Sequence, residues 1–182
     1  MLKTLITALL IFAPKHVTEG TAHENAAAAL HASQETGVPA KLLLAMAYHE
    51  SKYSPEALSR MQCGDSGCKR TTGMWTSTKR PPGSRPTFYC GIMQVGGWVS
   101  WEECLRLRND TMLNYLTGAQ HLVSWMNDPY CDHLGDEANL TCALRGYSGG
   151  YPAIKAQSTK YVSAIYLLQR KIERAISKVD VS

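Results

Sequence analysis

Residues 37–51 decide the fold, and they read Gly-Val-Pro-Ala-Lys-Leu-Leu-Leu-Ala-Met-Ala-Tyr-His-Glu-Ser. Gly37 predicts the end of one helix, because glycine readily takes the left-handed backbone that closes helices. Pro39 suits the first turn of a second helix, which should end near Lys52 because Pro55 disfavours helical geometry in the residue before it. The buried stripe of this second helix consists of Leu42, Leu43, Ala45, Met46 and Ala47.

Glu50 lies on the apolar side of this predicted helix, in line with Met46 and Leu43. Partial burial and the negative end of the helix dipole should both favour its protonated form. Cleavage of a glycosidic bond needs such an acid, because the departing sugar oxygen must receive a proton. The alternative, from position alone, is a solvated or ion-paired glutamate. The neighbouring His49 is predicted to be a surface or supporting residue without a catalytic role.

The remaining helices are predicted from capping residues and apolar spacing. One spans Glu24–Gln34, and a short one should restart at Pro55 with Ser54 as its cap. A helix over 109–126, capped by Asn109 or Asp110, should bury Met112, Leu116, Ala119, Val123 and Met126. A last helix over Ser158–Ile176 should turn Val162, Ile165, Leu168, Ile172 and Ile176 inward and Lys171, Arg174 and Lys178 outward. Strand signals are weak, so the sequence predicts a mainly α fold with a long loop or small hairpin between residues 60 and 90.

The size and charge of the chain indicate one domain with a modest attraction to acidic polymers. With 182 residues and 45% hydrophobic content, a single domain over residues 23–178 is expected behind a hydrophobic segment, residues 1–22. The formal net charge is +4, for which an ordinary solvated basic surface is the better explanation when charge is considered alone. No basic helix with base-reaching side chains is evident, so nucleic acid is not an expected partner.

The N-terminus has the charge-then-apolar order of a secretory signal, with Lys3 followed by an apolar run from Leu5 to Ala13. This run is too short to cross a bilayer, which takes about 20 apolar residues. Cleavage after Ala13 or Ala22 would each depart from the usual pattern. An uncleaved anchor with peripheral membrane contact, or a packing helix, is therefore the alternative.

Six cysteines without a Cys-x-x-Cys pair favour disulfides, and so an oxidising compartment. Short loops containing glycine or aspartate favour two of the pairs and leave the third as the remainder; the expected pairs are Cys63 with Cys68, Cys131 with Cys142, and Cys90 with Cys104. The alternative is a set of buried thiols in a cytosolic protein.

Five short motifs follow one another along the chain. They are Gly37-Val38-Pro39 leading to Glu50-Ser51 and Tyr53-Ser54-Pro55; Gly91-Ile92-Met93-Gln94-Val95; Asn114 with Gly118, Ala119 and Leu122; Gly146-Tyr147-Ser148-Gly149-Gly150; and Tyr161-Val162. Each is weak alone, but in this order they resemble the transglycosylase domain of soluble lytic transglycosylases and the related goose-type lysozymes. The resemblance implies a lysozyme-like α+β fold.

The resemblance also implies roles for individual residues, with Glu50 as the catalytic acid and no metal or other cofactor. The implied substrate-binding residues are Ser51, Gly91, Met93, Gln94, Tyr147, Ser148 and Tyr161. Glycine at 91 would let the backbone approach a sugar, Met93 would offer an apolar wall, and Gln94 could donate to and accept from sugar substituents. The alternatives are a core methionine, a surface glutamine and packing tyrosines.

The chain departs from the family pattern at several points. Ser148 stands where the family usually has asparagine, and Gln157 where it often has glutamate. The connection from Glu50 to Gly91 is longer than usual and contains Trp75 and the basic stretch 79–86. As an inserted loop it could stack on a sugar and meet acidic stem peptides, whereas the alternative is an unrelated surface loop.

The implied reaction is cleavage of the β-1,4 bond between N-acetylmuramic acid and N-acetylglucosamine in peptidoglycan, with Glu50 as sole acid and base and a 1,6-anhydro product. An inverting hydrolase would need a second carboxylate roughly 6.5–9.5 Å away, for which Asp65 is the only candidate. The alternatives are a hydrolytic muramidase and a non-catalytic glycan-binding or structural part of a phage or secretion assembly. Periplasmic or secreted protein, or a phage virion component, is the expected setting.

Overall fold

The computed structural model describes residues 1–64, 67–74 and 88–180, with the backbone alone at 59–64, 67–74, 97–99 and 180. The helices are α1 (Leu2–Phe12), α2 (Glu19–Thr36), α3 (Ala40–Ser51), α4 (Trp101–Asn109), α5 (Thr111–Met126), α6 (Asp136–Lys155) and α7 (Lys160–Asp180). The strands β1 (Ala57–Gly64), β2 (Gly67–Met74), β3 (Phe88–Cys90) and β4 (Val95–Val99) form one antiparallel sheet in the order β2-β1-β3-β4. The predicted mainly helical class with a small hairpin is confirmed.

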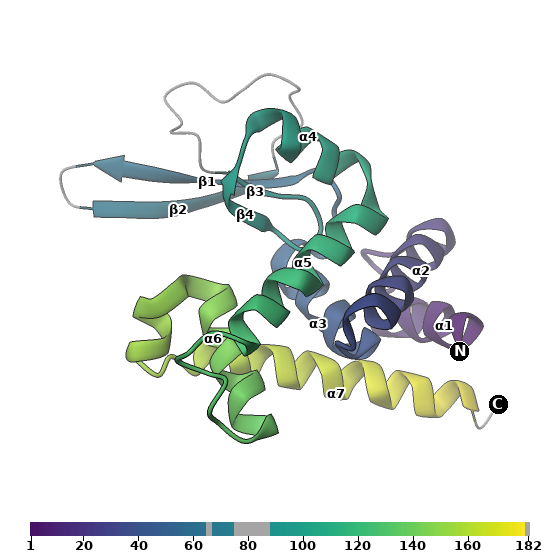
Figure 1. Ribbon diagram of the computed structural model, residues 1–182. Helices are drawn as coiled ribbons and strands as arrows, with labels where there is room; N and C mark the ends of the chain where they lie inside the picture. The colour runs from purple at the N-terminus through teal and green to yellow at the C-terminus, as the bar shows by residue number, and fades with distance from the viewer. Residues whose placement is uncertain (65–66, 75–87, 181–182) are drawn as a thin grey trace.

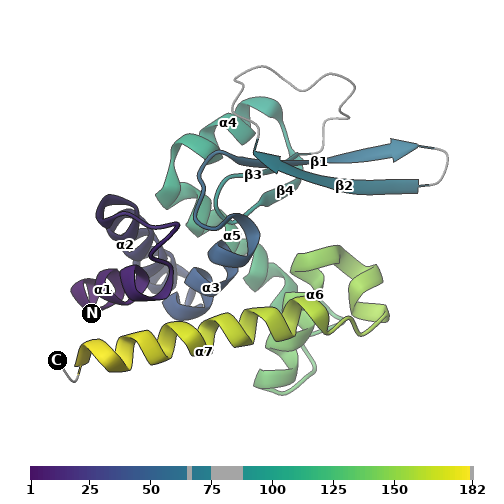
Figure 2. The same ribbon diagram turned by 180° about the vertical axis from the view of Figure 1, so that it is seen from behind.

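The helices surround α3 and α5, and the sheet lies to one side with α4 across β3 and β4 (Figure 1). Helix α7 runs along the helical body and packs against α1, α3 and α6. Both views show the β1–β2 hairpin and α6 projecting from the same side of the molecule (Figures 1 and 2). Glu50 lies at the end of α3, and a short turn leads from there to β1, so this end of α3 joins the helical body to the sheet.

The helices on either side of Gly37 agree closely with the prediction. Gly37 ends α2 with a φ of +77°, in the left-handed region, and α3 covers Ala40–Ser51. Helix α2 starts at Glu19, before the expected Glu24, because the Thr18 hydroxyl caps it by accepting from the Thr21 amide at 3.2 Å. The alanine-rich α2 and the apolar α3 supply much of the buried core.

The prediction of a short helix starting at Pro55 is wrong. Residues 54–56 form a turn, and the chain enters β1 at Ala57. Strand β1 pairs along its whole length with β2, and its residues 58–60 pair with β3 on the other side. These ladder hydrogen bonds outweigh the local start signal of Ser54 and Pro55, because a short helix gains little once its nucleation cost is met.

The face of α5 that meets the core also differs from the prediction. Asp110 caps the helix as expected, accepting from the Leu113 amide at 2.9 Å. However, Met112 is 42% exposed, and the residues actually buried are Thr111, Asn114, Tyr115, Gly118, Ala119 and Leu122. The buried polar groups have partners, for the Tyr115 hydroxyl donates to Asn25 Oδ1 at 2.8 Å. Of the other predicted residues, Ala119 is buried and Leu116, Val123 and Met126 are half-buried, so the apolar spacing found only part of the buried face.

Helix α7 follows the prediction, beginning at Lys160 where Ser158 was expected. The residues predicted to face inward are buried or half-buried, and the basic residues predicted to face outward are exposed. Helices α4 and α6 were not predicted, and their short or glycine-interrupted apolar patterns explain why.

The disulfides Cys90–Cys104 and Cys131–Cys142 are present, as predicted. Cys90–Cys104 joins the end of β3 to α4, and Cys131–Cys142 joins the loop after α5 to α6. Cys63 faces Cys68 in the backbone register of β1 and β2, but the side chains of this pair lie outside the described residues.

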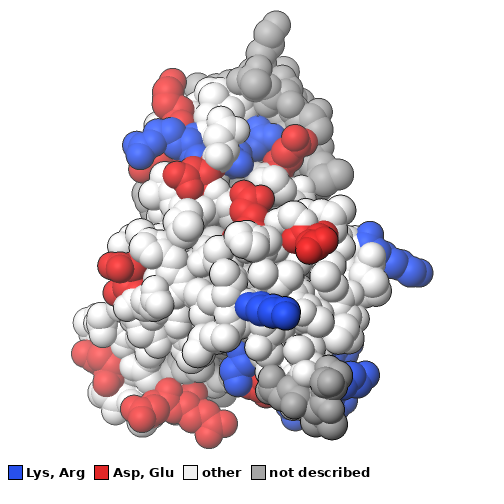
Figure 3. Space-filling model, turned by 90° about the vertical axis from the view of Figure 1, so that its right-hand side faces the viewer, with Lys and Arg blue, Asp and Glu red and all other residues white. Residues whose placement is uncertain are grey.

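Charges of both signs are interspersed over the described part of the face at the right of Figure 1, and its middle is largely uncharged (Figure 3). The positive net charge is thus not gathered into a single patch there. In addition, none of the described helices combines the length and the apolar character that a membrane-spanning helix requires.

The N-terminal helix α1 packs against α2 and α7, with Leu5, Ala8 and Leu9 buried. We expect Leu9→Ala to lower the free energy of unfolding by about 2–4 kcal/mol, because it leaves a cavity in a closed core. Ile11→Ala is the matched control, since Ile11 on the same helix is 44% exposed. Urea unfolding measures both. If Leu9→Ala were as stable as Ile11→Ala and the wild-type protein, α1 would not be part of the folded core of the purified protein. That result would be expected if residues 1–22 were cleaved off as a secretory signal.

Candidate functional site

The site is built around the C-terminal end of α3, where Glu50 is half-buried in the last turn. Two consecutive residues with positive φ, Lys52 at +57° and Tyr53 at +65°, turn the chain away immediately after it. Tyr53 is buried, and its hydroxyl donates to the Leu44 carbonyl at 3.1 Å. This anchor folds the departing chain back onto α3, so the turn after Glu50 has a fixed path.

Ser51 directs its hydroxyl back to its own helix, donating to the Ala47 carbonyl at 3.1 Å. Such a hydroxyl retains lone pairs that can accept from a ligand. Beside it, the ring of His49 lies 4.9 Å from the ring of Tyr161 at the start of α7, in an edge-to-face arrangement. The structure thus brings Tyr161 next to the neighbour of Glu50, although the two residues are far apart in sequence.

The turn Gly91–Gln94 docks on the segment that follows Glu50. The Gly91 amide donates to the Ala57 carbonyl at 2.9 Å. Gln94 Nε2 donates to the same carbonyl at 3.0 Å and to the Gly91 carbonyl at 2.9 Å. The side-chain amide of Gln94, expected to bind sugar, therefore also holds this turn against the start of β1.

Asn114 on α5 holds the same turn with two side-chain hydrogen bonds. Its Oδ1 accepts from the Met93 amide at 2.7 Å, and its Nδ2 donates to the Cys90 carbonyl at 2.9 Å. Gly91 has a φ of +70°, and a Cβ there would lie 2.4 Å from Asn114 Nδ2. Glycine is needed at 91 for this backbone conformation and for the close approach of Asn114.

Met93 is completely buried and packs against α5, where a Cβ on Gly118 would lie 2.8 Å from Met93 Cβ. This burial matches the alternative in which Met93 is a core residue. The Met93 carbonyl accepts from the Tyr147 hydroxyl at 2.7 Å. Tyr147 is half-buried on α6, while the hydroxyl of its neighbour Ser148 donates to the Arg145 carbonyl at 2.9 Å.

His121 and Trp125, which were not among the predicted site residues, support Tyr147 from α5. The His121 ring lies 5.1 Å from that of Tyr147, and His121 Nε2 accepts from Trp125 Nε1 at 3.0 Å. Burial lowers the pKa of His121 to about 4, so the ring is neutral at neutral pH and can accept this hydrogen bond. A histidine four residues before a tryptophan on one helix face was the signal available in the sequence.

Several predicted features lie outside the described residues, namely Asp65, Trp75 and the basic stretch 79–86. Within the described residues, no three His, Cys, Asp or Glu side chains gather in a way that could hold a metal ion.

The residues selected from the sequence therefore come from α3, the turn after β3, α6 and α7, and contacts between neighbouring segments link them. Comparison with protein-family models, with curated proteins and with solved structures finds no match to this chain.

Proposed function

We propose that this protein cleaves the glycan strands of peptidoglycan as a lytic transglycosylase, with Glu50 as its sole acid and base. The observation that carries the proposal is the linkage of three motifs distant in sequence around the end of α3. The Gly91–Gln94 turn binds the Ala57 carbonyl at the start of β1, Tyr147 binds that turn, and Tyr161 packs on His49. The family resemblance assigns all of these segments to the substrate site.

The position of Glu50 suits a proton donor. It is half-buried at the negative end of α3, and both conditions favour a neutral carboxyl group. In the proposed reaction Glu50 gives its proton to the bridging oxygen as the bond from that oxygen to C1 of muramic acid breaks. The resulting carboxylate then takes the proton of the muramoyl 6-hydroxyl as O6 bonds to C1. This route returns the proton to Glu50 and needs no second carboxylate.

The products distinguish this proposal from a hydrolytic muramidase. Purified sacculi digested with the protein are expected to release muropeptides that end in 1,6-anhydromuramic acid, identified by liquid chromatography and mass spectrometry. Such products are lighter by one water than those of hydrolysis and resist borohydride reduction. Muropeptides with reducing muramic acid ends alone would contradict the transglycosylase reaction and favour the muramidase.

We also infer that the protein works in the periplasm or outside the cell, where its proposed substrate lies. The disulfides Cys90–Cys104 and Cys131–Cys142 are compatible with an oxidising compartment.

A further inference from the structure

A row of aromatic rings leads from the candidate site to the surface. Tyr147, bonded to the Met93 carbonyl, lies 5.1 Å from His121, whose ring is 6.2 Å from that of Trp125. The Trp125 ring lies 5.2 Å from Tyr151, and Tyr151 lies 5.2 Å from Tyr130. The row therefore connects α5, α6 and the loop between them in one continuous series of ring contacts.

The outer two rings of this row are exposed. Tyr130 is 49% exposed and Tyr151 45% exposed, and their planes are inclined at 56° to one another. Large aromatic side chains contribute most to stability when they are buried, so two adjacent exposed rings invite a functional explanation. We call these two residues the tyrosine pair.

The tyrosine pair is held in place before any ligand arrives. The Tyr151 hydroxyl donates to Asp128 Oδ2 at 2.7 Å, and this hydrogen bond is the main reason that the pKa of Tyr151 is raised. Asp128 Oδ1 accepts from the Tyr130 amide at 3.0 Å. One carboxylate thus positions both members of the pair, which lowers the entropy cost of binding to them.

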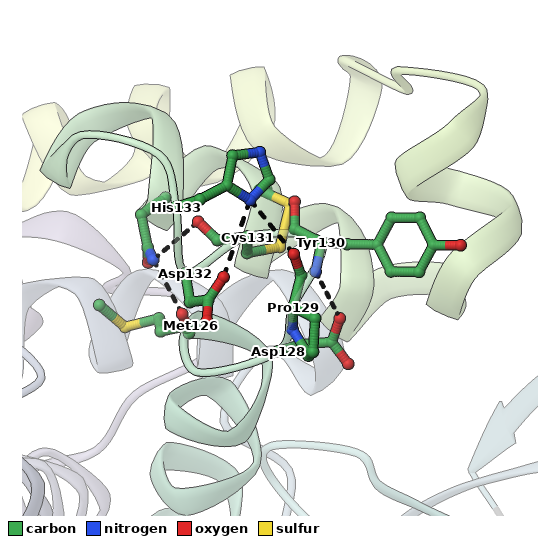
Figure 4. Close-up of polar contacts among 9 residues, drawn as sticks. Met126, Asp128, Pro129, Tyr130, Cys131, Asp132 and His133 are labelled. Atoms are coloured by element: carbon green, nitrogen blue, oxygen red, sulfur yellow. Dashed lines mark hydrogen bonds and ion pairs between the residues drawn. A yellow bond between two sulfur atoms is a disulfide. The ribbon is translucent and has the colours of Figure 1, made fainter.

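The loop that carries Tyr130 is fixed to α5 and α6 by a disulfide and by hydrogen bonds from Asn139. The Cys131–Cys142 disulfide ties it to α6, and Asn139 Nδ2 donates to the carbonyls of Met126 and Cys131 at 2.8 and 3.0 Å. Figure 4 shows the Tyr130 ring pointing away from these internal contacts. The disulfide therefore has a local consequence, because it fixes the base of an outward-pointing aromatic side chain.

A break in α6 places the other member of the pair. Gly150 has φ +64° and ψ −158°, a conformation open essentially only to glycine, and Gly149 beside it is also non-helical. The break redirects the chain just before Tyr151, so that its ring meets Trp125 at an interplanar angle of 76°. Trp125 in turn packs closely on Gly146, where a Cβ would lie 2.4 Å from the indole ring.

We propose that the tyrosine pair is an additional sugar-binding site that holds the glycan strand outside the site of Glu50. Sugar rings present apolar C–H faces that stack on tyrosine, and hydroxyl groups that suit the Asp128 carboxylate, which is hydrogen-bonded to both tyrosines. The Asp128 carboxylate also disfavours a phosphate group at the tyrosine pair itself. The surface that two side chains offer is also far smaller than the roughly 800 Å² per partner that a stable protein interface buries. The site rests on the proposed function, because that function supplies the glycan.

Binding to sacculi tests the pair separately from catalysis. The parent protein carries Glu50→Gln, so that strands are not cut, and its affinity is measured by sedimentation with purified sacculi. Adding Tyr130→Ala and Tyr151→Ala is expected to weaken binding by roughly five- to tenfold, as the loss of aromatic stacking implies. Tyr130→Phe with Tyr151→Phe keeps both rings and should retain most of the affinity. Leu167→Ala, which removes a 52% exposed apolar side chain from α7, should leave affinity unchanged.

The outcomes separate the pair from the catalytic proposal. If wild-type protein releases anhydro products and the alanine variant binds as tightly as its parent, the tyrosine pair is not a sugar site and the proposed function stands. If wild-type protein releases no products but the alanine variant still binds more weakly, the sugar site stands and the enzymatic proposal fails. A parent that does not sediment with sacculi overturns the sugar site whatever the digestion shows. Thermal unfolding of both variants guards against a folding defect. If the phenylalanine variant unfolded normally but bound as weakly as the alanine variant, stacking on the rings would not be the source of the affinity and the sugar site as proposed would fail.

Discussion

Glu50→Gln is expected to lower the rate of muropeptide release by roughly 10²–10⁴-fold, the usual contribution of a general acid and base. Glutamine has nearly the same size and can still form hydrogen bonds, but its amide cannot give up a proton at neutral pH or take one from a hydroxyl. The half-buried position of Glu50 should tolerate the exchange, so the variant is expected to fold normally and to bind sacculi. Zymograms and the release of soluble muropeptides measure the loss.

Glu56→Gln provides a matched control for this experiment. Glu56 is an exposed residue in the turn after α3, and its replacement makes the same chemical substitution in the same region. Its activity should stay close to that of the wild-type protein. If Glu50→Gln kept wild-type activity, Glu50 would not be the proton donor. If both wild-type protein and Glu50→Gln bound sacculi without cleaving them, the chain would be a glycan-binding component instead.

The sequence predicted those parts of the fold that depend on local signals. Glycine at 37 and the apolar spacing of α3 and α7 give helices that need only their own residues to be recognised. The prediction failed at Pro55, where a local start signal competes with the pairing of β1 to two other strands. Contacts of that kind join distant segments, and spacing along the chain does not reveal them.

The candidate site was predictable as a set of residues, but the contacts of its members were not. Met93 and Gln94 were selected as substrate-binding residues, whereas in the structure Met93 is buried in the core and Gln94 binds two backbone carbonyls. The partners Ala57 and Asn114 lie far along the chain from this turn. The same residue types serve either purpose, so only the fold shows which backbone groups they satisfy.

Asn114→Ala is expected to disturb the site from beneath, without removing any residue that meets the substrate. The substitution leaves the Met93 amide and the Cys90 carbonyl without their present partner in a buried region. We expect the free energy of unfolding to fall by about 2–4 kcal/mol, because each unsatisfied buried polar group costs about 1–3 kcal/mol. We also expect the rate of muropeptide release per folded molecule to fall roughly 10- to 100-fold, since small displacements of site residues carry costs of that order.

Asn25→Ala is a control that separates the loss of stability expected for Asn114→Ala from its loss of activity. Asn25 is equally buried and also makes two hydrogen bonds, from the Tyr115 hydroxyl at 2.8 Å and to the Thr21 carbonyl at 2.8 Å, but neither reaches the Gly91–Gln94 turn. It should therefore lower stability by a similar amount, measured by urea unfolding, while the folded protein keeps its activity. If both variants lost the same activity per folded molecule, the loss would reflect a general disturbance of the core and not the hold of Asn114 on the Gly91–Gln94 turn. A loss confined to Asn114→Ala would mean that the turn must be held from α5 for Glu50 to act on the glycan.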